Sequence, residues 1–335
     1  MRRVWTIAIG AAVAIAAAAP PDVTAQGRVI ITLASLAPEG SVWDTELKQL
    51  ASDWARLSNG SVQLRVAPGG RSGSECDVVP QLRAGVRPEA AALTTGLSCL
   101  DRAFSVFAVP FLFETIDEVF SVAHDLEPLL SGRLEPQGVT FLAWGFGGWI
   151  RIFSGAEITT LDGLKRAKLF SGAGDSSAEN WYRRNGFTPV VVGQNDIATS
   201  LASGGITAMP SPPYAALVFQ WYRETPYMLD LQVAPLLGAL VVNTRHWNRI
   251  PADLRPRLVD AARAMEARLK TKIPRQDDEA IKEMRARALK VTTPAAGFRQ
   301  SAEPLIESMR GAWVPDDIYD RALKARAAYR QARRP

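Results

Sequence analysis

The sequence predicts an α/β protein made of two α/β units and a helical tail. Short apolar runs rich in β-branched residues alternate with amphipathic helical segments over residues 29–94. The same alternation resumes over residues 140–243. From residue 252 the chain is rich in Ala, Arg, Leu and Glu at helical spacing. A length of 335 residues suits two domains, each able to bury its own core.

The first unit is predicted to begin with a buried strand at Val29–Leu33, which is a β-branched run. Ser41 or Asp44 caps the next helix, and Asn59-Gly60 ends it. One face of this helix carries its apolar residues, Leu47, Leu50, Ala51, Trp54 and Leu57. The other predicted elements are a strand at 62–66, a turn at Pro68-Gly69-Gly70, a helix at 77–84 and a strand at 90–94. This order favours a parallel sheet with helices on both faces.

The second unit is predicted from the same pattern. Its expected strands lie at 140–144, 149–153, 167–171, 189–192 and 236–243, and its helices at 161–166, 176–185 and 197–203. The tail is expected to stay helical to about residue 330, with interruptions at Pro274 and at Thr292-Thr293-Pro294. The chain has no internal repeat or low-complexity linker, so we expect strands that cross between the units to join them. Domain I is then residues 26–148 plus about 236–275, and domain II is residues 149–235 plus about 276–335.

Residues 1–25 predict a cleaved signal peptide. Arg2 and Arg3 precede an apolar run from Trp5 to Ala19, and Val23-Thr24-Ala25 supplies the small residues that a signal peptidase requires. The run of roughly 15 residues is shorter than the ~20 that span a bilayer, although an uncleaved N-terminal anchor is the alternative. We therefore expect a mature protein that begins at Gln26, resides in the periplasm and does not itself span the membrane.

The charge pattern and the residue composition argue against a nucleic-acid-binding protein and against a metal site. The net charge of +5 is spread along the chain without a block of five or six like charges, which argues against a nucleic-acid partner. The two histidines, His124 and His246, have no metal-ligand spacing, so we expect no metal site. Cys76 and Cys99 could form a disulfide in an oxidising compartment, or could remain two half-buried thiols.

No motif predicts catalysis or a cofactor. Neither Phe153-Ser154-Gly155 nor Phe170-Ser171-Gly172 supplies the G-x-S-x-G elbow of a serine nucleophile. Gly145-Phe146-Gly147-Gly148 lacks the helix start or Lys-Ser/Thr of a phosphate loop. Asp277-Asp278 and Asp316-Asp317 lie near predicted helix starts, where they complement the helix dipole. We expect a protein that is not an enzyme.

Aromatic residues are concentrated in the middle third of the chain, where Arg151 also lies. They are Trp144, Phe146, Trp149, Phe153, Phe170, Trp181, Trp221 and Tyr222. Ligand pockets are lined mainly by apolar and aromatic groups with a few polar ones, although the same residues could simply form a core.

Several segments, taken in order and spacing, resemble the periplasmic substrate-binding subunit of TRAP transporters, of the C4-dicarboxylate-binding type. The segments are Gly69-Gly70-Arg71-Ser72-Gly73-Ser74-Glu75, Gln81–Gly85, Val109-Pro110-Phe111-Leu112-Phe113, Leu161–Lys165, Val190–Leu201 and Val241–Trp247 leading to Ile250-Pro251. The resemblance covers nearly all of residues 28–330. It implies two α/β domains joined by crossing strands, a long helix, and a central cleft that closes on a solute. It also implies transfer of that solute to a membrane permease.

The sequence departs from the family pattern at two polar anchors. Most members hold a substrate carboxylate with an arginine in a strand whose counterpart here is Lys168-Leu169-Phe170-Ser171, so Phe170 occupies the arginine position. A second family arginine matches Arg151. The family asparagine that bonds substrate is replaced by Ser211, in the segment Ile206–Pro212. A phenyl ring is unable to imitate the planar, charge-assisted pairing of a guanidinium with a carboxylate.

These departures predict a ligand more apolar than a C4-dicarboxylate, either a monocarboxylate held by Arg151 or a neutral hydrophobic molecule. The expected ligand-binding residues are Arg151, Phe170, Ser211, Trp149, Trp144, Ser171, Glu75, Trp181, Tyr214 and Leu236. The competing hypothesis is a ligand sensor or accessory envelope protein without a transport role, for which Arg321–Arg334 could be a contact helix. The alternative for that segment is a solvated helix.

Overall fold

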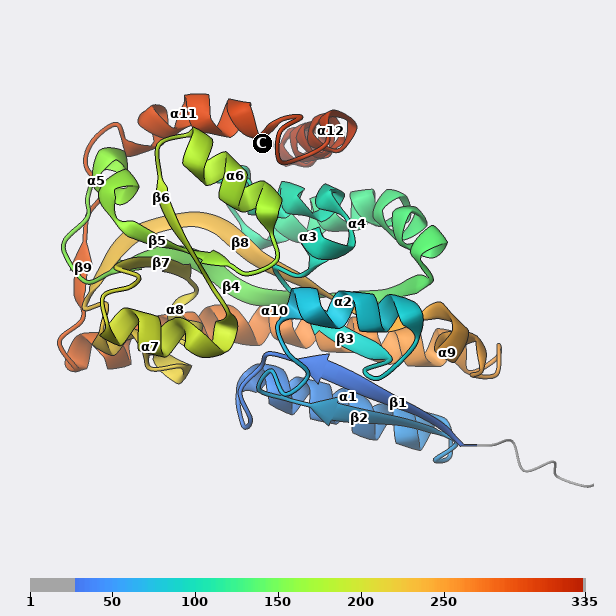
Figure 1. The fold of residues 1–335 in the computed structure, drawn as a ribbon. Coiled ribbons are helices and arrows are strands. Elements are labelled where there is room, and N and C mark those ends of the chain that lie inside the picture. Colours follow the sequence, from blue (N-terminus) through green and yellow to red (C-terminus); the bar gives the residue numbers. More distant parts are fainter. Residues whose placement is uncertain (1–27, 334–335) are drawn as a thin grey trace, which may run out of the picture.

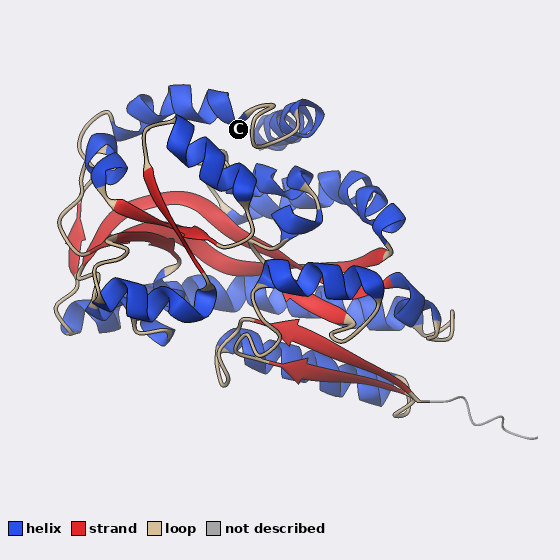
Figure 2. Ribbon diagram, in the orientation of Figure 1, coloured by secondary structure: helices blue, strands red, loops and turns tan. Residues whose placement is uncertain are grey.

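The computed structural model describes residues 28–333, which form a mixed sheet covered by helices (Figures 1 and 2). The strand order is β2-β1-β3-β8-β4-β7-β5-β6, and β9 pairs with β8. The strands are β1 Val29–Ser35, β2 Val62–Ala67, β3 Ala90–Leu93, β4 Val139–Ser154, β5 Lys168–Gly172, β6 Thr188–Val192, β7 Ala208–Ser211, β8 Tyr227–Asn243 and β9 Lys290–Thr292. Strands β1–β3 therefore lie at one end of the sheet and β5–β7 at the other, and we call these ends the first and second lobes.

The α-helices follow the strands in an α/β order and end in a helical tail. They are α1 Val42–Leu57, α2 Glu75–Ala84, α3 Leu97–Leu100, α4 Ile116–Leu134, α5 Leu161–Arg166, α6 Ser176–Arg184, α7 Ile197–Ala202, α8 Pro213–Val218, α9 Thr244–Asn248, α10 Arg255–Ala286, α11 Phe298–Met309 and α12 Asp316–Ala332. Short 3₁₀ helices lie at Arg102–Ala108, Glu135–Gln137, Gln194–Asp196 and Trp221–Arg223. The predicted α/β class with crossing strands and long C-terminal helices is confirmed.

Strands β4 and β8 join the two lobes. They run antiparallel over most of their length, while β3 pairs with β8 in the first lobe and β7 pairs with β4 in the second. The outer strands are parallel within each lobe, as predicted, but the central pair makes the whole sheet mixed. The prediction of separate strands at 140–144 and 149–153 was wrong, because one bulged strand covers both.

The glycines between those segments are needed for close packing. Register shifts interrupt the β4–β8 pairing between Phe146 and Trp149. Gly148 has φ +118°, and a Cβ atom placed there would lie 2.7 Å from the Asp277 carboxylate and from Pro212. A side chain at Gly147 would lie 2.7 Å from Leu236. These glycines therefore form a bulge in β4 where other groups approach the backbone closely.

Helix α10 packs along β4, on the side of the sheet opposite α6 and α11 (Figure 1). The predicted interruption at Pro274 was wrong, because α10 is continuous through it. A proline there removes one hydrogen bond to the preceding turn. The flanking Ile273 and Asp277 are buried, and this packing holds the helix together across the missing bond. Asp277 is consequently inside a helix and not at a helix start, whereas Asp316 does open α12, as predicted.

The C-terminal helix α12 packs against α4. Arg321 forms an ion pair with Asp125 at 3.1 Å, and the Arg330 guanidinium donates hydrogen bonds to the buried Glu118 carboxylate of α4. One face of this helix is therefore part of the fold, with Ile318, Tyr319 and Ala322 buried. Every helix among residues 28–333 is too short or too polar to span a lipid bilayer. The predicted signal peptide lies outside the described residues.

Candidate functional site

A cavity of about 430 Å³ is lined by residues of both lobes and of the crossing strands. The first lobe contributes the end of β1, the start of α1, the start of α2 and residues 92–95. The second lobe contributes β5, the end of β7, and helices α5, α6 and α11. The middle of β4 and of β8 completes the wall. This volume lies within the ~300–1,000 Å³ typical of small-molecule sites.

Seven of the ten predicted ligand-binding residues line this cavity. They are Glu75, Trp144, Phe170, Ser171, Trp181, Ser211 and Leu236. Phe170 and Ser171 come from β5, which is a short strand between β6 and β7, and Ser211 ends β7. Of the predicted aromatic group, Phe146 and Trp221 also line the cavity, whereas Phe153 and Tyr222 do not.

The structure places the other three predicted residues outside the lining. Tyr214 joins the lobes instead, because its hydroxyl accepts a hydrogen bond from the backbone N–H of Val42 at 3.1 Å. Its ring also lies 4.8 Å from that of Trp43, which does line the cavity. Trp149 packs beside Phe146, and its backbone N–H donates to Asp277.

Arg151 is the third of these residues. Its neighbours on β4, Ile150 and Ile152, line the cavity, but Arg151 does not. The guanidinium instead forms an ion pair with the Asp230 carboxylate of β8. In this structure the Arg151 charge is therefore paired, and the residue lies outside the cavity lining.

The charged residues that line the cavity are acidic. Among the described residues, no Arg, Lys or His contributes to the lining, whereas Glu75 and Asp175 do. Asp175 accepts hydrogen bonds from Ser98 at 2.8 Å and from the backbone N–H of Ala178 at 3.0 Å. The cavity therefore presents aromatic and aliphatic walls, a few hydroxyl groups and negative charge.

Glu75 is buried, and its carboxylate accepts four hydrogen bonds. The donors are the backbone N–H and hydroxyl of Thr94, the hydroxyl of Thr95 and the backbone N–H of Gly96. Burial raises the pKa of the Glu75 carboxyl, and these donors oppose that shift. The side chain thus ties the start of α2 to the loop after β3, with three of the four hydrogen bonds on one carboxylate oxygen and one on the other.

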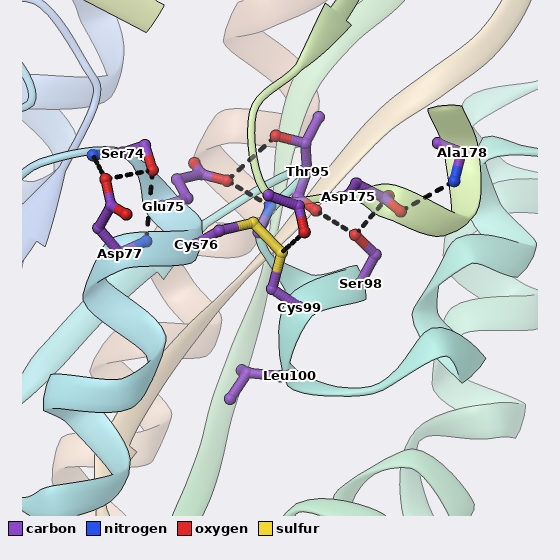
Figure 3. The surroundings of a disulfide bond; sticks show 12 residues. Ser74, Glu75, Cys76, Asp77, Thr95, Ser98, Cys99, Leu100, Asp175 and Ala178 are labelled. Carbon is purple, nitrogen blue, oxygen red and sulfur yellow. Dashed lines mark hydrogen bonds between the residues drawn. A yellow bond between two sulfur atoms is a disulfide. The ribbon is translucent and has the colours of Figure 1, made fainter. Parts of the chain in front are cut away.

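A disulfide between Cys76 and Cys99 reinforces the same connection (Figure 3). The Cα atoms are 5.6 Å apart, which suits a disulfide. The bridge and the Ser98–Asp175 hydrogen bond lie side by side where the first lobe meets the second. A Cβ atom at Gly174 of the second lobe would lie 2.5 Å from the Cys76 Cβ atom, which shows how closely the lobes approach.

Replacing both cysteines, in Cys76→Ser/Cys99→Ser, is expected to lower the free energy of unfolding by about 3 kcal/mol. The bridge closes a segment with a sequence separation of 23 residues, and its loss frees the unfolded chain. Urea denaturation measures the change. As a control, a reducing agent should shift the wild-type protein toward the variant and leave the variant unchanged. An unchanged denaturation midpoint in the variant would contradict the expectation.

The architecture defines a two-lobed binding protein with its cavity between the lobes. The family model for the bacterial extracellular solute-binding proteins, family 7, matches residues 33–311. The chain belongs to this family. Its members are solute-binding proteins, which confirms the prediction of a protein that is not an enzyme.

Individual relatives are distant in sequence but close in fold. A solute-binding protein of Sulfitobacter sp. (strain NAS-14.1) is 22% identical over 264 residues, which is 78% of this chain and 80% of that protein. The galactonate complex of the sugar acid binding protein DctPAm from Advenella mimigardefordensis has a TM-score of 0.83, with 18% identity over 90% of this chain and 99% of that one. A TRAP periplasmic solute-binding protein from Xanthobacter autotrophicus Py2, with bound β-D-galacturonate, has a TM-score of 0.81, with 17% identity over 89% of this chain and 99% of that one.

Proposed function

We propose that this protein binds an uncharged, largely apolar organic solute in the cavity between its lobes and delivers it to a TRAP-type membrane permease from the periplasm. The permease and the compartment are proposed from the family and from the predicted signal peptide. The observation that carries the ligand class is the cavity lining, which has no basic side chain among the described residues.

A carboxylate in this cavity would lack a partner. It would lie in an apolar site whose charged lining residues, Glu75 and Asp175, are acidic. Burying an unpaired ionised carboxylate costs several kcal/mol, and nearby negative charge adds to that cost. The similar structures hold galactonate and galacturonate, so this protein would differ from them in ligand class.

The cavity therefore does not suit equally well the two ligand classes predicted from the sequence, a monocarboxylate and a neutral molecule. A monocarboxylate would need Arg151, whose guanidinium pairs with Asp230 outside the lining. A neutral molecule needs only apolar contact and a few hydroxyl partners, which Phe170, Ser171 and Ser211 offer. We accordingly propose the neutral class.

The test compares 1-decanol with decanoate at pH 8, because the two share a chain and differ in the charge of the head group. Isothermal titration calorimetry measures both affinities on purified protein freed of any bound solute. We expect 1-decanol to bind at least tenfold more tightly than decanoate, and galacturonate and succinate to give no heat of binding at millimolar concentration. Micromolar binding of decanoate, galacturonate or succinate would overturn the proposal.

A further inference from the structure

Most polar side chains of the cavity lining come from the first lobe and from the ends of β5 and β7, with Asp175 and Gln194 as further polar residues of the second lobe. The first lobe contributes Ser35 and Thr94 among others, and the two strand ends contribute Ser171 and Ser211. Helices α5, α6 and α11 contribute another part of the wall, and there the lining is apolar except for polar atoms of two aromatic residues of α6. The wall formed by α5, α6 and α11 is therefore less polar than the rest of the cavity lining.

Those two aromatic residues are Trp181 and Tyr182. The indole N–H of Trp181 already donates to the Ser308 hydroxyl at 3.0 Å. The ring of Tyr182 packs edge-on against that of Phe187, which also lines the cavity. Most of this wall therefore offers a ligand apolar contact without hydrogen-bond partners.

Helix α11 supplies the longest apolar face in the part of the cavity wall that α5, α6 and α11 form. Its lining residues recur at helical spacing, at Phe298, Ala302, Leu305, Ile306 and Met309. The intervening Arg299, Gln300 and Glu303 are exposed. The helix lies next to α5 on the outside of the second lobe (Figure 1). An amphipathic helix of this kind normally buries its apolar stripe against a solid core, but here the stripe also borders a cavity.

Phe111 links this helix to the crossing strand β8. Its ring lines the cavity and lies 5.0 Å below the Arg299 guanidinium of α11. Its backbone has φ +58°, a left-handed conformation that bulky side chains rarely adopt, and its N–H donates to the Val233 carbonyl at 2.7 Å. Backbone strain of this kind persists where the surrounding structure enforces it and is concentrated at ligand sites.

From this distribution we infer that the solute is an elongated, uncharged amphiphile, with a hydroxyl or amide head at the serine and threonine side chains and an apolar chain beneath α11. The inference rests on the proposed function and deepens it. A cavity of 430 Å³ has room for roughly 14 non-hydrogen atoms at about 30 Å³ each. A chain of about ten carbons with a small head group fits that volume.

The affinities of 1-hexanol, 1-octanol and 1-decanol test whether an apolar chain of the ligand is buried in the cavity. Each buried methylene group should raise the affinity about fourfold, so each step of two carbons should raise it about 16-fold. Calorimetry or displacement of the neutral fluorophore N-phenyl-1-naphthylamine measures the affinities. Equal affinity for the three alcohols would overturn the inference while leaving the proposed function intact. Absence of binding by all three would overturn both.

The variant Ala302→Trp places a large ring in the compartment beneath α11. It should weaken 1-decanol binding at least 20-fold and change 1-hexanol binding by less than threefold. The matched control, Glu303→Trp, adds the same ring on the exposed side of the same helix and should change neither affinity. If Ala302→Trp fails to fold, Ala302→Leu replaces it, with a smaller loss expected for 1-decanol only. Unchanged 1-decanol binding in the folded variant would overturn the inference.

Discussion

Replacing Phe170 with arginine is expected to reverse the charge preference of the cavity. Phe170 lines the cavity from β5 and is half-buried, and it occupies the position where the resemblance places an arginine. A guanidinium there would offer two parallel donors to a carboxylate, and hydrogen bonds to charged groups contribute about 1.5–3 kcal/mol each. We expect decanoate to bind about 10–100-fold more tightly to Phe170→Arg than to the wild-type protein.

The same substitution should weaken 1-decanol binding by a similar factor, because an unpaired buried cation resists desolvation. Calorimetry with both ligands measures the reversal, and a thermal melt confirms that the variant folds. The control is Phe170→Leu, which keeps an apolar side chain and should still prefer 1-decanol. A folded arginine variant that keeps the wild-type preference would show that Phe170 does not set the charge of the ligand.

The second large expected effect is a pH dependence of the free energy of unfolding, which arises from the buried carboxyl of Asp277 in α10. Burial raises the pKa of Asp277 from 3.8 to about 7, although backbone donors at Tyr214 and Trp149 and the charge of Arg151 oppose the shift. The folded protein therefore holds this proton more tightly than the unfolded chain does. The free energy of unfolding should fall by about 4 kcal/mol as the pH rises from about 4 to about 7, and this contribution should level off above that range.

In Asp277→Asn this part of the pH dependence should disappear. Urea denaturation at pH 4.5 and pH 7.5 compares the variant with the wild-type protein. The control is Asp278→Asn, which removes an exposed neighbouring charge that is a minor cause of the raised Asp277 pKa, and it should keep most of the wild-type pH dependence. Equal pH dependence in Asp277→Asn and the wild-type protein would contradict the assignment.

Much of the fold could be predicted because local patterns and tertiary packing agree. Val29–Leu33 and the helix that follows it carry clear β-branched and amphipathic patterns, and the structure confirms both elements. Helix α4 carries an equally clear pattern, although no helix was predicted there. Thr115 caps it, Glu118 lies three residues later, and the apolar residues from Val119 to Leu134 recur at helical spacing.

Other features depend on distant parts of the chain. Strand β7 contains Pro210 and has no alternating pattern, so its place depends on pairing with β4 and β5. The closure of the disulfide depends on the distance between Cys76 and Cys99, which Glu75 and the loop after β3 determine. The burial of Asp277 depends on the bulge of β4, where Gly148 leaves room for its carboxylate.

Some residues of the candidate site could likewise be predicted from the sequence, and others could not. Phe170, Ser171 and Ser211 were predicted from residue chemistry and from family positions, and the structure brings them to one cavity. The expected role of Arg151 required knowledge of which face of β4 it occupies and of its partner Asp230. The contribution of α11 was not predicted, because an amphipathic helix has the same sequence pattern whether its apolar face borders a core or a cavity.

The most direct test of the central claim is the identity of the molecule that remains bound when the protein is isolated from its natural host. Mass spectrometry of the solute released from the native, non-denatured protein identifies it without a choice of candidate ligands. We predict an uncharged molecule with a hydroxyl or amide group and an apolar chain, of about the size that the 430 Å³ cavity accepts. Recovery of a dicarboxylate or a sugar acid in stoichiometric amount would contradict the account.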